Sequence, residues 1–234
     1  MAKLHAGMVK HADCFLALEQ SAGKGQRGKH WKTAPGKNIT ISAAISLPQA
    51  FSAATITKLQ SFPFLFSAAI ALTCYDFIKA SDVTDIKIKW PNDLYIGDRK
   101  AGGILIENSI RSGEWQWSIV GIGINLNQDL FDAGIPNAVS LKQVTKREFD
   151  LIACTRQLAS LLAKRLHWLN VAPVQEVMLS YNQQLYKAQQ DVRLRKDNAV
   201  FTTTILHVDT SGKLHTSDVI NRTFSSGEVE FISA

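Results

Sequence analysis

The stretch DIKIKWPNDLYIGDRKAGGILIE, residues 85–107, decides the fold because three short runs rich in Ile and Leu are separated by turn-forming residues. Short apolar runs bounded by Pro, Asn, Asp and Gly are typical of strands. We therefore expect strands at 85–90, 94–96 and 101–107. The segment Gly97-Asp98-Arg99-Lys100 is typical of a hairpin turn that joins the last two strands.

Further elements are expected on both sides of this stretch. Residues 12–19, 38–47 and 115–125 have the apolar composition of strands. Residues 64–80 carry apolar side chains at helical spacing, directly after Pro63, and predict a helix buried against the sheet. From Arg147 onward, leucines mark one face of an amphipathic helix, and a second helix is expected after Pro173. The elements do not alternate as βαβ units, so the fold class is α+β, with a mixed or antiparallel sheet packed against helices.

The last part of the chain has a different pattern. After Gln190 the sequence consists of short β segments separated by turn signals at Asp197-Asn198, Ser211-Gly212 and Ser226-Gly227. This pattern predicts a small C-terminal β-barrel. In a chain of 234 residues, we expect a catalytic domain at 1–188 and this small domain at 189–234.

Composition excludes several classes of protein. The chain is 46% hydrophobic and 20% charged, with a mean hydropathy of -0.02, which is typical of a globular enzyme. The longest apolar stretch, 62–78, is interrupted by polar residues and is shorter than a bilayer requires. The N-terminus shows no secretion signal, so we expect a cytoplasmic protein. The three cysteines and six histidines show no metal-binding spacing, so any metal should arrive with a nucleotide.

Basic residues gather in one part of the chain. The net charge is +6, and no Asp or Glu occurs between Ser21 and Tyr75. The cluster lies near the start of that stretch and consists of Lys24, Arg27, Lys29, Lys32 and Lys37. Such a charge suits an acidic protein, a phosphate-bearing ligand or a nucleic acid, and the charge alone does not choose among them.

The segment Gly23-Lys24-Gly25-Gln26-Arg27-Gly28 has the spacing GxGxxG. A dinucleotide-binding turn should open directly into a helix and should be followed about 20 residues later by an acid. Here Pro35, Gly36 and Asn38 follow instead, which argues against that fold. Two interpretations stay open: a loop whose backbone and basic side chains wrap a phosphate, or a solvated basic surface loop.

Polar residues also follow the strand at 85–90. Asn and Asp are common in turns, so Asn92 and Asp93 are typical of ordinary turn formers. Lys100 follows across the hairpin, beside Gly102 and Gly103, so that a carboxylate, an amide and a lysine could converge where bare backbone leaves room. Such a cluster suits acyl-adenylate chemistry, in which lysine charges and Mg²⁺ neutralise the reacting phosphate and an aspartate guides an attacking amine.

The strand at 115–125 ends in Gly121-Ile-Gly123-Ile-Asn125. Asn125 could hydrogen-bond an adenine or a phosphate. Glycines in a strand more often indicate tight packing, and both interpretations can hold together.

These residues resemble the catalytic domain of biotin–protein ligases. The resemblance rests on EQSAGKGQRGKHW (19–31), PGKNITIS (35–42), KWPNDLYIGDRKAGGILIE (89–107) and VGIGINLN (120–127), while SSGEVEFIS (225–233) is similar to the end of the family's small barrel. It covers nearly the whole chain and implies a class II synthetase-like catalytic domain. It further implies that biotin is activated by ATP as biotinyl-5'-AMP and passed to a lysine of the biotin carrier domain of a carboxylase.

The resemblance also implies roles for individual residues. Lys100 and Asp93 would be catalytic, with Mg²⁺ accompanying ATP. Biotin would be bound by Gln20, Gly23, Lys24, Gly25, Gln26, Lys100, Gly103 and Gly123. ATP and the adenylate would be bound by Arg27, Lys29, Trp31, Lys89, Asn92 and Asn125. The expected partners are the carrier domain, biotin and ATP, with no nucleic acid and no membrane, and a homodimer is compatible with the pattern.

Two departures from the family pattern have consequences. Gln26 stands where family members commonly have arginine, which replaces a cation near the adenylate by a neutral amide. An upstream strand with a Ser-Thr-Asn segment, which binds the biotin ring in the family, is not seen before residue 12, nor is there room for a DNA-binding winged helix. Two alternatives therefore stay open: a catalytically weak biotin-binding or carboxylase-interacting module, and a lipoate-type ligase of the same fold superfamily.

Overall fold

Six antiparallel strands form the main sheet of the computed structural model, which describes residues 1, 4, 7–28, 30–132 and 137–232. The strands lie in the order β1-β2-β6-β5-β4-β3. Their bounds are β1 Cys14–Leu16, β2 Ile39–Ser46, β3 Ile86–Lys89, β4 Asp93–Ile96, β5 Arg99–Arg111 and β6 Glu114–Ile124. The three strands expected in residues 85–107 are all present and are hydrogen-bonded in sequence order. The α+β class is confirmed.

Two of the expected boundaries were wrong. The hairpin turn is shorter than predicted, because Arg99 and Lys100 already pair with Ile96 and Tyr95 in the β4–β5 ladder. The strand expected at 12–19 is reduced to Cys14–Leu16. Ala12 has a φ of 66°, which is incompatible with extended backbone, so the strand starts after it.

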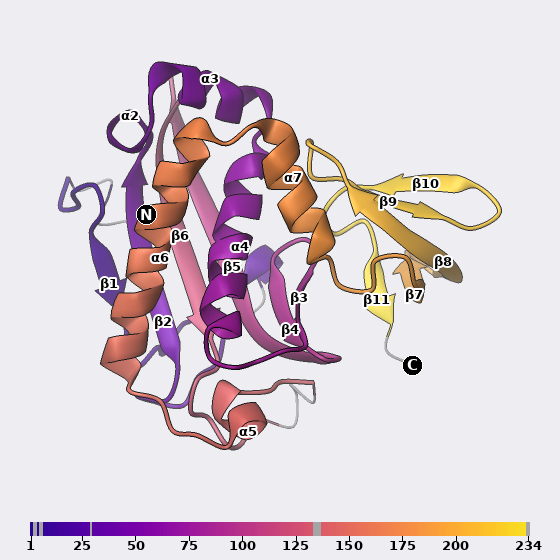
Figure 1. Ribbon diagram of the computed structural model, residues 1–234, viewed down its shortest axis with the longest axis horizontal. Helices are drawn as coiled ribbons and strands as arrows, with labels where there is room; N and C mark the ends of the chain where they lie inside the picture. The colour runs from indigo at the N-terminus through magenta and orange to yellow at the C-terminus, as the bar shows by residue number, and fades with distance from the viewer. Residues whose placement is uncertain (2–3, 5–6, 29, 133–136, 233–234) are drawn as a thin grey trace.

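Helices cover one face of the main sheet (Figure 1). The central helix α4, Phe64–Lys79, is buried on nearly all sides between the sheet and two further helices, α6 (Leu151–Val171) and α7 (Val174–Gln183). Its apolar residues therefore form the centre of the hydrophobic core. Among the described residues, three short helices complete this part of the chain: α2 Leu47–Ala50, α3 Ala53–Ser61 and α5 Leu141–Thr145.

None of the described helices is by itself long and apolar enough to cross a membrane. The pair α3 and α4 meets that length and composition together, with a bend of 99° between the two helices.

A second antiparallel sheet follows the helices, with the strand order β10-β9-β8-β7-β11. Its strands are β7 Asp191–Lys196, β8 Ala199–Val208, β9 Leu214–Ser217, β10 Asn221–Phe224 and β11 Glu230–Ile232. The expected barrel was wrong: β10 and β11 are opposite edges, and within the described ranges no pairing joins them. The hairpin of β9 and β10 extends away from the body of the molecule (Figure 1), so the sheet stays open. The division into domains at residue 188 remains a prediction, although β7 begins close to it.

The two sheets contact each other near the start of α4. The indole nitrogen of Trp90 donates a hydrogen bond to the Gly212 carbonyl at 2.9 Å, and the side chain of Asn182 in α7 bonds the backbone N–H and carbonyl of Val208. Gly212 lies so close to the Phe64 ring that an added Cβ would be 2.6 Å from it. These contacts bring the C-terminal sheet to the end of the main sheet where β3 and β4 lie.

Candidate active site

Helices cover one face of the main sheet (Figure 1), and a cavity of about 990 Å³ is lined by residues of its strands β2, β5 and β6. Side chains alternate across a strand. On β2, β5 and β6, the side chains of residues such as Ile41, Ile104 and Ile122 are buried in the core, so their neighbours Ser42, Gly103 and Gly123 face the opposite side of the sheet. Both sets of residues line the cavity. These strands form one side of the cavity, and from here on this side is called the floor.

Two glycines of this floor leave room for the side chains that lie against it. A Cβ added to Gly123 would lie 2.5 Å from the Trp31 ring, and one added to Gly103 would lie 3.3 Å from Asp93 Oδ1. The glycines thus allow both close packing and close approach of side chains to bare backbone, which are the two interpretations that the sequence left open.

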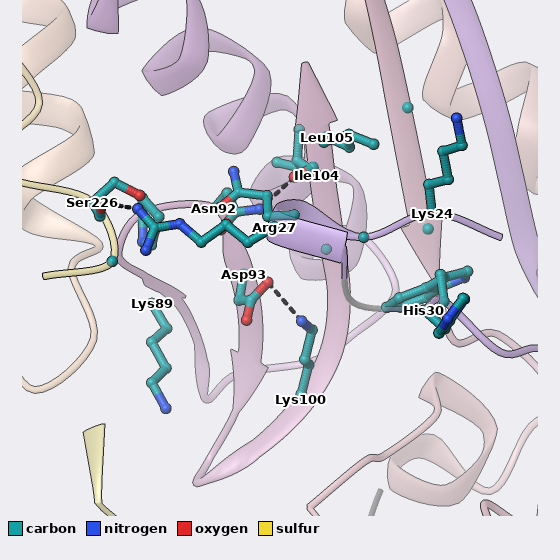
Figure 2. A pocket seen from close by; sticks show the side chains of 18 of the residues that line it. Lys24, Arg27, His30, Lys89, Asn92, Asp93, Lys100, Ile104, Leu105 and Ser226 are labelled. Carbon is teal, nitrogen blue, oxygen red and sulfur yellow. Dashed lines mark hydrogen bonds and ion pairs between the residues drawn. The ribbon is translucent and has the colours of Figure 1, made fainter. Parts of the chain in front are cut away.

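Asp93 and Lys100 meet on this floor (Figure 2). Lys100 Nζ lies 2.7 Å from Asp93 Oδ1, and the two side chains are 31% and 26% exposed. Asp93 begins β4 and Lys100 lies near the start of β5, so the short hairpin between the strands brings them together. The Lys100 ammonium also lies 5.8 Å from the centre of the Trp31 ring. A cation, a carboxylate and an aromatic face are thus available to a ligand in the cavity.

Asn92 and Asn125 form hydrogen bonds to the backbone near this pair. The Asn92 side-chain amide donates a hydrogen bond to the Ile104 carbonyl, and the Ile104 N–H donates back to the Asn92 carbonyl. Asn92 still lines the cavity, whereas Asn125 is buried outside its lining. The Asn125 amide donates to the carbonyls of Lys100, at 3.3 Å, and Val139, at 3.1 Å. Asn125 therefore fixes the backbone that carries Lys100.

The glycine-rich loop closes over one side of the cavity. Gln20, Lys24, Gly25, Gln26 and Arg27 line it. The loop is tied at its base, where the Trp31 N–H donates to the Gly23 carbonyl at 2.9 Å, and it leads into β2. This connection to a strand agrees with the rejection of a dinucleotide-binding turn. Lys29 lies outside the described residues.

Gly23 and Trp31 mark the boundary with a second, smaller cavity of about 390 Å³. Gly23 lines only this second cavity, and a Cβ there would lie 2.6 Å from Gln20 Oε1. Trp31 borders both cavities, and its indole N–H is buried with no hydrogen-bond partner within the described part of the chain. A donor of this kind is costly to leave unpaired.

Lys89 lines the cavity but points away from the Asp93–Lys100 pair (Figure 2). Its ammonium donates a hydrogen bond to the Tyr95 hydroxyl at 3.1 Å. Burial lowers the pKa of Lys89, and burial likewise raises the pKa of Tyr95 to about 12.

The sequence analysis missed one wall of the cavity. This side consists of residues 226–231, in the turn before β11 and in β11 itself, and from here on it is called the wall. Arg27 of the glycine-rich loop donates a hydrogen bond to the Ser226 carbonyl (Figure 2). The segment 225–233 was identified only as the end of a barrel, and its similarity to the family was the one signal that pointed to it.

Residues 5–125 match the family model described as "Biotin/lipoate A/B protein ligase family". The chain is 29% identical over 160 residues to the bifunctional ligase/repressor BirA of Escherichia coli, covering 68% of this chain and 46% of that protein. It is 36% identical over 125 residues to the biotin–[acetyl-CoA-carboxylase] ligase of Paracoccus denitrificans, covering 53% and 45% of the two chains. The chain thus spans about half the length of these relatives.

Solved structures show the same fold. The biotin protein ligase from Aquifex aeolicus in complex with biotin and ATP superposes with a TM-score of 0.78 at 20% identity, covering 97% of this chain and 91% of that one.

Proposed function

The chain belongs to the biotin/lipoate A/B protein ligase family, and from that premise we propose that it activates biotin with ATP and transfers it to a lysine of a carboxylase's biotin carrier domain. The observation that carries this proposal is the Asp93–Lys100 pair on the glycine floor, with the atoms 2.7 Å apart. The name of the relative in Paracoccus denitrificans, biotin–[acetyl-CoA-carboxylase] ligase, supports biotin as the substrate and a carboxylase as the source of the acceptor.

The geometry suits the first step of such a reaction. A carboxylate that attacks the α-phosphate of ATP forms a new C–O–P linkage and releases pyrophosphate, and both reacting groups are negatively charged. We propose that the Lys100 ammonium binds the biotin carboxylate and the α-phosphate and reduces their repulsion. Mg²⁺ would enter with ATP, since it prefers phosphate oxygens with one or two carboxylates, and carboxylates such as Asp93 and Glu107 line the cavity.

In the second step, an acceptor amine displaces AMP from the biotinyl group. The amine must lose a proton to attack, and we propose that Asp93 orients it and accepts that proton. Asp93 is suited to this role because it is only partly exposed and already binds one ammonium group, that of Lys100.

The remaining residues are proposed to hold the two substrates. Gln20, Lys24, Gly25, Gln26, Gly103 and Gly123 would surround biotin, with Gly23 packed beneath the loop. Arg27 and Trp31 would contact the adenylate, while Lys29 keeps the same role as a proposal from sequence alone. Asn92 and Asn125 would act mainly by fixing backbone, as their hydrogen bonds indicate. We place the reaction in the cytoplasm, and a homodimer remains compatible with this arrangement.

Pyrophosphate exchange tests the first step. The protein is incubated with ATP, labelled pyrophosphate and either biotin or lipoate, and label entering ATP is measured. We expect exchange with biotin and none with lipoate. Exchange with lipoate alone would favour a lipoate-type ligase, and no exchange with measurable biotin binding would favour a binding module.

The second step needs its own assay. Transfer of labelled biotin to an isolated carrier domain is compared with transfer to a carrier whose acceptor lysine is replaced by arginine. Label should appear only on the carrier with lysine.

A further inference from the structure

Lys89 has surroundings that differ from those of Lys100. Lys100 Nζ binds a carboxylate, whereas Lys89 Nζ lies over three aromatic rings. Its distances to the ring centres are 4.4 Å for Tyr95, 4.8 Å for Phe231 and 5.5 Å for Tyr186. No salt bridge to Lys89 is present among the residues that the structure describes.

The three rings come from separate parts of the chain. Tyr95 lies on β4 of the main sheet, Tyr186 follows α7, and Phe231 lies on β11 of the second sheet. The rings also contact one another, with centres 5.1 Å apart for Tyr95 and Tyr186 and 6.4 Å apart for Tyr186 and Phe231. Lys89 thus lies where the main sheet, the segment after α7 and the second sheet meet.

This contact bears directly on the wall. Phe231 pairs with Leu194 of β7, and the neighbouring residues 226–230 line the cavity. Most of the turn before β11 is exposed, so few buried contacts hold it. A cation over aromatic faces attracts them electrostatically, and the attraction is stronger where water is partly excluded.

We propose that Lys89 is a positioning residue that holds β11 and the turn before it against the main sheet, so that they form the wall of the cavity. It does so through the ring of Phe231 and does not itself bind the nucleotide, so this role would replace the nucleotide-binding role that the resemblance implied for Lys89. The kinetic part of this inference rests on the proposed function, whereas the structural part does not.

Three variants test the proposal. Lys89→Met keeps the length of the side chain and removes the charge, Lys89→Arg keeps a cation that can bind ring faces, and Phe231→Leu removes the ring. Lys87→Met is the matched control, because Lys87 lies on the same strand and its ammonium donates a hydrogen bond to the Gln183 carbonyl at 3.3 Å. The first measurement is amide hydrogen exchange of residues 226–232 in the protein without ligands.

We expect Lys89→Met to raise exchange in this segment by roughly three- to thirtyfold, while Lys89→Arg and Lys87→Met stay near the wild type. The double variant of Lys89→Met and Phe231→Leu should exchange no faster than the faster of the two single variants. Unchanged exchange in Lys89→Met, or additive effects in the double variant, would overturn the proposal.

The second measurement is steady-state pyrophosphate exchange. Lys89→Met should raise the KM for ATP more than it lowers kcat, and the effect should disappear when Phe231 is already Leu. A KM effect of equal size with either residue at position 231 would indicate direct contact with the nucleotide and would refute the proposal. If the wild type shows no pyrophosphate exchange at all, the proposed function fails, and the hydrogen-exchange result still decides the role of Lys89.

Discussion

The floor of the cavity and its wall are built in different ways. The floor consists of long strands of the main sheet, and the opposite face of these strands is buried in the core. The wall is a turn and the three-residue strand β11, which within the described residues pairs with β7 alone. Segments with few buried contacts open more easily than the core. The proposed reacting groups Asp93 and Lys100 therefore lie on the more extensively buried part of the cavity, and the wall is the part that we expect to open more easily.

Removing the lysine of the floor should have the largest effect. Lys100→Ala deletes the cation that would stabilise charge at the reacting phosphate, and we expect pyrophosphate exchange to fall roughly 100- to 1000-fold. Arg99→Ala is the control, because Arg99 is the exposed neighbour on the same strand. Melting temperatures near the wild type would show that the fold survives. Exchange at the wild-type rate in Lys100→Ala would contradict the assignment of the chemistry to the floor.

Changing the carboxylate should separate the two steps. Asp93→Asn keeps the size of the side chain and removes its charge, so we expect transfer to slow by at least about tenfold. Transfer is timed in a single turnover from preformed biotinyl-AMP, and pyrophosphate exchange is measured in parallel. An unchanged rate of transfer would remove Asp93 from the proposed role.

A methyl group on the floor should move an aromatic residue. Gly123→Ala places a Cβ within 2.5 Å of the Trp31 ring, so the ring must shift or the strand must strain, at about 1–3 kcal/mol of stability. Gly121→Ala is the control, since its Cβ would lie 3.4 Å from the Leu105 carbonyl oxygen and would meet no ring. We expect the KM for ATP to rise about tenfold in Gly123→Ala only. Equal kinetics in the two variants would show that the contact with Trp31 does not matter for the site.

The sequence predicted the floor much better than the wall. The runs at 85–107 and 115–125 carry their own strand and turn signals, and the hairpin they predict also brings Asp93 next to Lys100. The wall carries a turn signal at Ser226-Gly227, but nothing in the sequence places it at the cavity, because residues 226–228 are exposed and become part of the site only through the packing of the two sheets.

Errors elsewhere have the same origin. The barrel was expected from a series of short strands, but whether such strands close depends on the pairing of distant edges, here β10 and β11. The apolar composition of residues 12–19 gave no warning of the left-handed conformation at Ala12. The side-chain amide of Asn125 was expected to bind a ligand, and only the structure shows that it donates hydrogen bonds to two backbone carbonyls.

The smallest expected effect concerns the sheet that carries the wall. Asp209 closes the turn between β8 and β9. Burial acts to raise its pKa, but hydrogen bonds from His215, Ser211 and Lys213 outweigh it and leave the pKa lowered. A carboxyl whose pKa is lower in the folded than in the unfolded state stabilises the fold at neutral pH, and this contribution is lost as the pH falls below about 4. We therefore expect Asp209→Asn to cost at most about 1 kcal/mol at pH 7, since the site is partly exposed, and the difference in melting temperature from the wild type should decrease as the pH falls below about 4, with part of it still present at pH 3 because the lowered pKa keeps the folded-state carboxyl ionised there. Asp197→Asn, in the exposed turn between β7 and β8, is the control and should differ little at any pH.

If the difference for Asp209→Asn stayed constant from pH 7 to pH 3, the turn would be stabilised by side-chain shape and not by charge. If hydrogen exchange then rose in β8 and β9 but not in residues 226–232, the wall would be independent of the rest of its sheet and held mainly by its contacts with the main sheet.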